Sequence, residues 1–574
     1  MKKGLIMMLG LLIAFSVQAQ TPYSRSDNYK GKFEQLGQEL PTPNAYRTAS
    51  GAPGVDYWQQ QADYDIKVEL NDENQSITGS ETITYHNNSP DNLTYLWLQL
   101  DQNMRGKDSN TPKISSTRIR EEMSAKTMQQ YVVADVDFDG GFKIASVTHE
   151  SGVDLPYTIN QTMMRVDLTQ PLKSGDKVSF NIDWSYNVND RMQLGGRSGY
   201  EYFPEDDNYL YTIAQWFPRM AVYDDKEGWQ TKQFLGRGEF ALAFGDYKVA
   251  ITVPSDHILA STGALQNPEE VLTSAQLKRY KQAQTSEEII IIATQKEAEK
   301  REKSKAKDTK TWIFHAENVR DFAFASSRKF IWDARMVPLN GKQPLAMSFY
   351  PKEGNPLWEQ ESTKAVANTL ITYSKLTIDY PYPVAISVHA ASIGMEYPMI
   401  CFNFGRPDAD GTFTDQTKWR MIGVIVHEVG HNYFPMIINS DERQWTWMDE
   451  GLDSYVQLRT QREHYPDMPE RRGTAKTITN YMKGDPDFIR PIMTNSEQIV
   501  QFGSNAYSKP SAGLDILRET IMGPELFDAA FKEYATRWAF KHPAPADFFR
   551  TMEDASAVDL DWFWRGWFYS TDYV

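Results

Sequence analysis

The chain has 574 residues, a formal net charge of −16, 41% hydrophobic residues and 13% aromatic residues. Its length exceeds what one hydrophobic core serves, so two or three domains are expected. The apolar content excludes a chain that is disordered over most of its length. The negative charge argues against non-specific binding to nucleic acid or to an anionic membrane surface, because both would repel the protein.

The N-terminus has the pattern of a secretory signal. Lys2 and Lys3 precede an apolar run of about a dozen residues, and a small-residue cleavage site ends at Ala19. The run is too short to span a membrane and no later segment is long enough, so stable membrane insertion is not expected. We expect residues 1–19 to be a cleaved signal peptide and the mature protein to be periplasmic or secreted. The single cysteine, Cys401, cannot form an internal disulfide, which fits a bacterial periplasm or exterior.

Residues 22–336 have the pattern of an N-terminal antiparallel β domain. The segments "DIKVEL", "ETITYH" and "LTYLWLQL" alternate apolar and polar residues and are separated by turn-rich runs. This period of two is typical of strands with one buried face. A charged run around residues 266–310 interrupts the pattern. Its composition predicts a solvated helical or mobile insertion, with a partner-binding role as the alternative.

Residues 337–574 change to helical periodicity. "WEQESTKAVANTLITYSKL" has apolar residues three and four apart, and the segments "GVIVHEVGHNYF", "MDEGLDSYVQLRTQREHY" and "SAGLDILRETIM" also predict helices. "YPVAISVHAA" predicts a strand. The sequence therefore predicts a multidomain α+β protein, in which a mostly helical domain with a small sheet follows the β domain.

One predicted helix carries the pattern of a metal site. His427 and His431 are four residues apart and share a helix face, so both imidazoles can bind one ion while Glu428 stands beside it. The alternative is a helix whose histidines are satisfied by hydrogen bonds in the core. A catalytic zinc usually has three protein ligands, and Glu450 is the candidate for the third. The eighteen intervening residues contain a proline and a polar turn, which lets a second helix begin near Trp447. An unpaired carboxylate in that apolar setting would be costly, whereas a metal ion satisfies it.

The combination of HExxH, eighteen residues and Glu resembles the zinc-binding signature of the M1 family of metallopeptidases, which are gluzincins. The resemblance covers nearly the whole mature chain and implies a β domain followed by a thermolysin-like catalytic domain with one Zn²⁺ per chain. It implies a zinc-dependent aminopeptidase that cleaves the N-terminal bond of peptides with a free N-terminus. Longer members continue into a further helical domain, so this chain is expected to be a two-domain member or part of a longer one.

The resemblance assigns three further positions. "SIGMEYP" matches the family motif Gly-x-Met-Glu-Asn at Met395 and Glu396, although Ile393 replaces the first Gly and Tyr397 replaces the Asn. Glu396 would hold the substrate ammonium by charge-assisted hydrogen bonds, and a structural cap or ion pair is the alternative. "NAYSKPSAGLDIL" resembles the family stretch Tyr-x-Lys-Gly, with Pro510 in place of the Gly, and places Tyr507 where the family has a tyrosine that donates to the developing oxyanion. "AQWFPRMAVYDD" makes Gln215 a candidate contact to the substrate's amino end, with aromatic packing at a strand end as the alternative.

The predicted mechanism is metal-assisted hydrolysis, with Glu428 as general base and then general acid. A zinc endopeptidase of the same clan and an epoxide hydrolase of the same family remain as rivals. A non-catalytic binding protein on the same scaffold is a rival of another class. That rival would be expected to have lost ligands, whereas all three ligands and the base are intact here. The sequence predicts neither the oligomeric state nor the preferred N-terminal residue.

Overall fold

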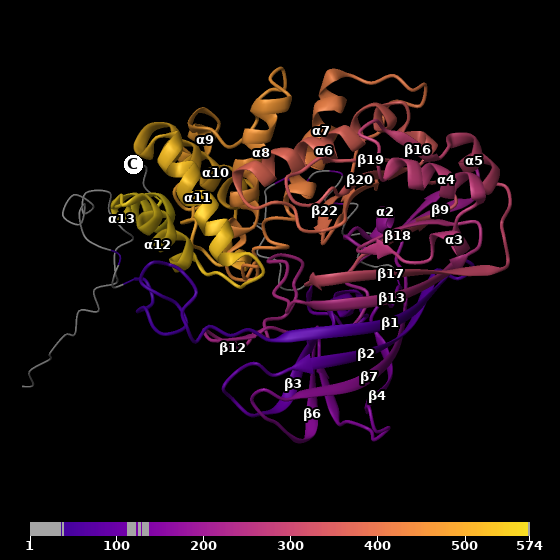
Figure 1. Cartoon of the computed structure of the whole chain (residues 1–574), viewed down its shortest axis with the longest axis horizontal. Helices are drawn as coiled ribbons and strands as arrows, with labels where there is room; N and C mark the ends of the chain where they lie inside the picture. The colour runs from indigo at the N-terminus through magenta and orange to yellow at the C-terminus, as the bar shows by residue number, and fades with distance from the viewer. Residues whose placement is uncertain are drawn as a thin grey trace, which may run out of the picture.

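The computed structural model describes residues 36, 39–111, 122, 123, 125, 128 and 137–571. A β-rich N-terminal half lies against a mostly helical C-terminal half (Figure 1), which confirms the predicted α+β architecture. The expected signal peptide at residues 1–19 and its cleavage site lie outside the described residues. In the part of the chain that the structure describes, no helix combines the length and apolarity that crossing a membrane requires.

The largest sheet of the N-terminal half has seven strands. In spatial order they are β15 (Ala264–Leu265), β17 (Thr309–Val319), β13 (Gly245–Pro254), β1 (Gln61–Asn71), β2 (Ser76–His86), β7 (Lys177–Asn187) and β4 (Lys143–His149). Buried residues alternate with more exposed ones along β1 and β2, as the period of two predicted. The sheet is antiparallel except for β1 and β13, which pair in parallel because the chain passes through other sheets before it returns.

Two four-stranded sheets complete the β half. One has the order β10 (Arg219–Met220), β3 (Leu93–Gln99), β6 (Met163–Leu172), β5 (Tyr157–Asn160); the other has β14 (Ile258–Ser261), β18 (Phe324–Ser327), β9 (Asn208–Ile213), β8 (Gly199–Phe203). A short hairpin joins β11 (Tyr223–Asp224) and β12 (Gly228–Trp229). Trp184 of β7 packs against Trp216, and its partner across the strands is Gly79. A Cβ at Gly79 would lie 2.4 Å from the Trp184 ring, so only glycine leaves room for this core residue.

A six-stranded sheet supports the helical half. Its order is β16 (Ile290–Ala293), β19 (Ile331–Met336), β20 (Leu345–Tyr350), β21 (Val384–His389), β23 (Ile400–Asn403), β22 (Gly394–Tyr397). The boundary expected near residue 337 falls between β19 and β20, which pair along their whole length. The charged segment forms α3 (Pro268–Val271), α4 (Ser274–Ala283) and α5 (Gln295–Arg301), and it also contributes β16 to this sheet. The segment is therefore attached to the sheet of the helical half.

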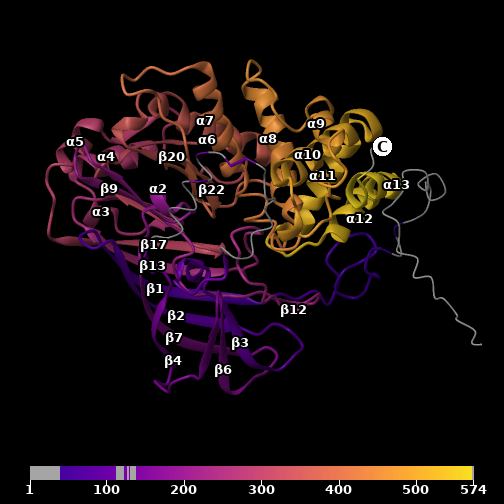
Figure 2. The same ribbon diagram turned by 180° about the vertical axis from the view of Figure 1, so that it is seen from behind.

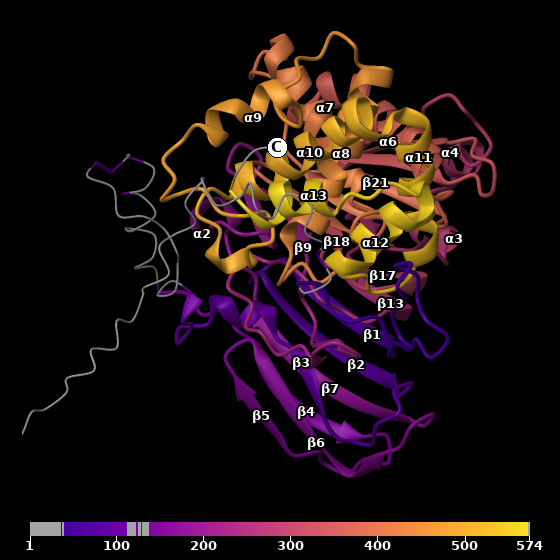
Figure 3. The same ribbon diagram turned by 90° about the vertical axis from the view of Figure 1, so that its left-hand side faces the viewer.

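The helices pack on this sheet and beyond its end (Figures 2 and 3). They are α6 (Leu357–Leu376), α7 (Asp415–Gly430), α8 (Glu450–His464), α9 (Ala475–Met482), α10 (Lys509–Ile516), α11 (Pro524–Trp538), α12 (Pro545–Ser556) and α13 (Asp561–Trp564). The C-terminal helices α11 to α13 lie at the end of the helical half that is farthest from α5 (Figure 1).

Residues 431–449, which join α7 to α8, are pinned to the β half by buried ion pairs. Arg320 is fully buried, donates to Asn439 Oδ1 at 2.6 Å and pairs with Glu442. Arg443 donates to Asp101 of the β half at 3.2 Å. Separating these pairs would leave a buried charge without a partner, which costs free energy. The pairs therefore fix residues 431–449, and with them the position of Glu450, against the β half.

Candidate active site

The two histidines come from the end of α7 and the carboxylate from the start of α8. His427 and Glu428 lie in the last turn of α7, and His431 is the residue that caps its C-terminus. Glu450 is the first residue of α8. All four side chains are at least 94% buried. The end of one helix and the start of the next therefore face each other, as the sequence spacing predicted.

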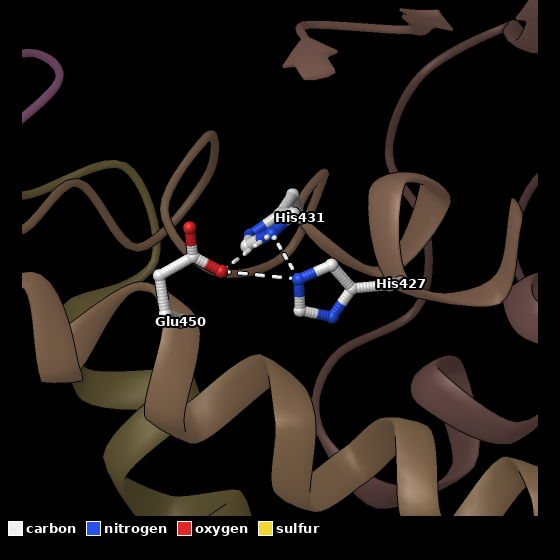
Figure 4. Close-up of side chains that lie close together, drawn as sticks. All are labelled: His427, His431 and Glu450. Atoms are coloured by element: carbon white, nitrogen blue, oxygen red, sulfur yellow. Dashed lines mark hydrogen bonds and ion pairs between the residues drawn. The ribbon is translucent and has the colours of Figure 1, made fainter. Parts of the chain in front are cut away.

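Three donor atoms converge on one point (Figure 4). His427 Nε2 lies 3.0 Å from Glu450 Oε2 and 3.2 Å from His431 Nε2, and the second histidine lies 3.4 Å from the same carboxylate oxygen. Tetrahedral zinc with ligands at about 2.0 to 2.2 Å separates its donor atoms by roughly 3.3 to 3.6 Å, so this triangle is close to the required size. Two imidazoles and one carboxylate are also the donor set that zinc prefers. The residues fit a zinc ion.

The other nitrogen of each imidazole faces an acceptor. His427 Nδ1 lies 2.6 Å from Asp453 Oδ2. His431 Nδ1 lies 2.8 Å from the Phe434 carbonyl oxygen and 2.9 Å from Asp449 Oδ1. These acceptors keep the proton on Nδ1, which leaves both Nε2 lone pairs free for a metal. Burial lowers the pKa of His427, but the charge of Asp453 and the hydrogen bonds to Asp453 and Glu450 together outweigh it, so the net shift of the pKa is upward.

Asp453 was not identified from the sequence. It is three residues after Glu450 on α8, so the two carboxylates share one helix face, and this spacing could have revealed it. Its second oxygen accepts a hydrogen bond of 2.7 Å from the hydroxyl of Tyr373 on α6. A Cβ at Gly430 would lie 2.2 Å from that hydroxyl and 2.3 Å from Asp453 Oδ1. The glycine of the HEVGH run therefore makes room for the chain of contacts from Tyr373 to His427.

Glu428 lies beside the three donors and lines an open cleft of about 530 Å³ together with His427 and Tyr507. A Cβ at Gly394 of β22 would lie 2.4 Å from Glu428 Oε1, so the carboxylate occupies space that only glycine leaves free. Burial raises the pKa of Glu428 to about 7, although the two histidines oppose the shift. A carboxyl group with a pKa in this range can both accept and return a proton near neutral pH.

Glu396 of β22 belongs to a cluster of buried carboxylates next to His431. The cluster comprises Glu239, Glu396, Glu442 and Asp449, with oxygens that lie within 4.8 Å of one another. Arg197 pairs with Glu239 and Arg320 with Glu442, so two of the four charges are compensated. Glu396 Oε1 has no hydrogen-bond partner among the described residues, and burial raises its pKa. An ammonium group would complete this cluster. Met395, the other residue predicted from the same motif, is buried opposite Phe402 of β23.

Tyr507 lies on the π-helical turn η7 (Gly503–Ser508), which precedes α10. Its hydroxyl donates to Glu450 Oε1 at 2.5 Å, and its ring stacks on His427 with centroids 5.5 Å apart. Burial, reinforced by the charge of Glu450, raises its pKa, so the phenol stays a donor. A Cβ at Gly451 would lie 2.7 Å from Pro510, so the glycine after the metal ligand lets α10 approach closely enough to bring Tyr507 in.

Gln215 does not line the cleft beside the metal-binding residues. Its side-chain amide donates to Asp101 Oδ2 at 2.9 Å, and it lines a separate cavity of about 90 Å³. Asp101 also pairs with the buried Arg219. The structure therefore places Gln215 in the buried polar network of the β half, and its predicted contact with the substrate stays a prediction.

The chain is similar to known proteins in sequence and in fold. The model of the Peptidase family M1 domain matches residues 362–567. Alanine/arginine aminopeptidase of Saccharomyces cerevisiae is 22% identical over 246 residues, which cover 40% of this chain and 28% of the relative. Human glutamyl aminopeptidase is 26% identical over 148 residues, covering 25% and 15%. The chain thus spans less than a third of these relatives' length. The crystal structure of an M1 zinc metallopeptidase from Deinococcus radiodurans shares the fold, with a TM-score of 0.57 and 13% identity over 90% of this chain and 96% of that one.

Proposed function

We propose that this chain is a member of peptidase family M1 and a zinc-dependent aminopeptidase that hydrolyses the N-terminal bond of peptides, a proposal supported by the match of residues 362–567 to the family model. The observation that carries the proposal is the convergence of two imidazole nitrogens and one carboxylate oxygen within 3.4 Å, beside an open cleft. His427, His431 and Glu450 would hold the zinc. When bound, zinc supplies Lewis acidity, which lowers the pKa of water and polarises a carbonyl group.

The chain's own residues would move the proton. Glu428 accepts a proton from the attacking water and delivers it to the leaving amine, which its pKa of about 7 allows. Tyr507 donates to Glu450 in the structure, and the same hydroxyl can turn its hydrogen bond to the carbonyl oxygen as negative charge develops there. A donor of this kind is worth about 3 kcal/mol of the barrier.

Glu396 would restrict cleavage to the first peptide bond by binding the substrate ammonium. Its unpartnered oxygen and the nearby Asp449 offer a buried negative site for the substrate ammonium, next to the ligand His431. An acetylated N-terminus lacks the positive charge and would leave these carboxylates uncompensated. A zinc endopeptidase would not depend on this contact.

The test uses aminoacyl-chromophore substrates, matched free and N-acetylated peptides, and a chelator. We expect hydrolysis of the free forms, its loss on chelation and its return with zinc. Glu428→Gln should lower kcat by a factor of about 10² to 10⁴ while zinc still binds. Hydrolysis that survives complete removal of zinc would refute the proposal. A preference for acetylated peptides would instead indicate an endopeptidase.

We also propose that the protein is exported to a periplasm or secreted, because Lys2, Lys3 and the cleavage site ending at Ala19 form a signal pattern. N-terminal sequencing of the mature protein from cell fractions tests this. A mature chain that begins at residue 20 in the exported fraction is the expected result, and an uncleaved cytoplasmic chain would contradict it.

A further inference from the structure

Strand β22 is the outermost strand of the six-stranded sheet, and it carries two groups that the active site uses. It pairs with β23 on one side only. Glu428 Oε1 fills the space beside Gly394, the first residue of the strand, and Glu396 belongs to the carboxylate cluster. An edge strand of four residues has few backbone hydrogen bonds to fix it. Its position therefore also depends on contacts at its two ends.

The segment that leads into β22 is held by Arg191 of α2 (Arg191–Leu194). Arg191 Nη1 donates to the Ala391 carbonyl oxygen, three residues before Gly394. Ser392, which lies between them, has a φ of 61°, a left-handed conformation that is uncommon for residues with a side chain. Arg191 is 5% exposed, and its Nε and Nη2 have no hydrogen-bond partner among the described residues. A buried guanidinium with a single acceptor costs free energy, which indicates that this contact serves more than stability.

The segment that leaves β22 is held by Thr262, which follows β14. The Thr262 hydroxyl donates to the Pro398 carbonyl oxygen at 2.8 Å and accepts from the Ala323 amide at 3.1 Å. Thr262 is fully buried. Like Arg191, it comes from the β half. The two contacts therefore fasten both ends of β22 to the half of the molecule that does not carry the metal ligands.

The metal ligands do not lie on β22. His427 and His431 lie at the end of α7 and Glu450 at the start of α8, so a shift of β22 would leave the zinc triangle in place. The same shift would open space beside Glu428 and move Glu396 relative to the other carboxylates of the cluster. A displacement of about 1 Å near a reacting group can cost about 10²-fold in rate.

We propose that Arg191 and Thr262 are positioning residues, which hold β22 so that Glu428 can transfer the proton and Glu396 can bind the substrate ammonium. This inference rests on the proposed aminopeptidase function. Neither Arg191 nor Thr262 lines the cleft at the metal site, so both act through the strand. The β half would thereby control both steps without supplying a zinc ligand.

Conservative variants test the two contacts. Thr262→Val removes the hydroxyl at nearly the same volume and Thr262→Ser keeps it, whereas Arg191→Met removes the donors and Arg191→Lys keeps one. The kcat, KM and zinc affinity are measured with a chromophore substrate. We expect Arg191→Met and Thr262→Val each to lower kcat/KM by about ten- to a hundredfold, through both kcat and KM, with unchanged zinc affinity. Arg191→Lys and Thr262→Ser should recover most of that loss, which a general loss of stability would not explain.

Arg328→Met is the control for the loss of a buried guanidinium. Arg328 is 4% exposed and pairs with Asp72 and Asp256. This variant should lower the melting temperature but keep the wild-type kcat and KM at temperatures where it is folded.

The outcomes separate this inference from the proposed function. An active wild type together with unchanged kcat and KM in either Arg191→Met or Thr262→Val overturns the inference and leaves the aminopeptidase proposal standing. A loss of zinc affinity as large as the loss of activity also overturns it, because the effect would then come from the metal site. A wild-type protein that hydrolyses none of the chromophore substrates refutes the aminopeptidase proposal, and this inference with it.

Discussion

Replacing Asp453 by Asn should weaken zinc binding while leaving the three ligands in place. Asp453 is fully buried and lies 2.6 Å from His427 Nδ1. Asparagine keeps the shape and can still bond to the hydroxyl of Tyr373, so the change removes the negative charge that fixes the imidazole. A carboxylate that accepts from the second nitrogen of a metal-binding histidine contributes about 10- to 100-fold in metal affinity, or roughly 1.4 to 2.7 kcal/mol.

Asp449→Asn is the matched control. Asp449 Oδ1 lies 2.9 Å from His431 Nδ1, but that nitrogen also has the Phe434 carbonyl oxygen at 2.8 Å. The backbone acceptor remains in the variant, so we expect a smaller loss than for Asp453→Asn. Zinc dissociation constants are measured by competition with a chromogenic chelator, and activity is measured at saturating zinc. Equal losses in the two variants, or an unchanged affinity in Asp453→Asn, would refute the reasoning about the imidazole proton.

Other sites give separate predictions. Gly394→Ala puts a Cβ 2.4 Å from Glu428 Oε1, so kcat should fall by about 10²-fold while the zinc affinity, measured by the same competition, is retained. Burial raises the pKa of Asp333 to about 7, so wild-type stability from this group is lost as pH rises from about 4 to about 7. In denaturant unfolding, the free energy of unfolding of Asp333→Asn relative to that of wild type should therefore be higher at about pH 8 than at about pH 5. An equal difference at the two pH values would contradict this. Removing zinc should lower the melting temperature, since zinc at a hundredfold excess over Kd adds about 2.7 kcal/mol by linkage.

The metal site was predictable because its geometry is local. A helix fixes His427 and His431 on one face, and the short connection between α7 and α8 restricts the positions that Glu450 can reach. The position of Gln215 depends instead on how the sheets of the β half pack, and a strand-end motif does not encode which cavity a side chain faces. Strand β16 could not be predicted from the sequence for the same reason. Its four residues are a short apolar run inside a charged, helix-forming segment, and only pairing with the distant β19 makes them a strand.

The β half also supplies charges without which the carboxylate cluster could not be buried. Glu239, Glu396, Glu442 and Asp449 lie within 4.8 Å of one another, and their mutual repulsion adds to the cost of taking each from water. Both compensating cations, Arg197 and Arg320, come from the β half, whereas the metal ligands lie at the end of α7 and at the start of α8. The proposed ammonium site thus depends on the two halves together. A helical half on its own would have to protonate or expose the carboxylates that the proposed aminopeptidase uses to recognise its substrate.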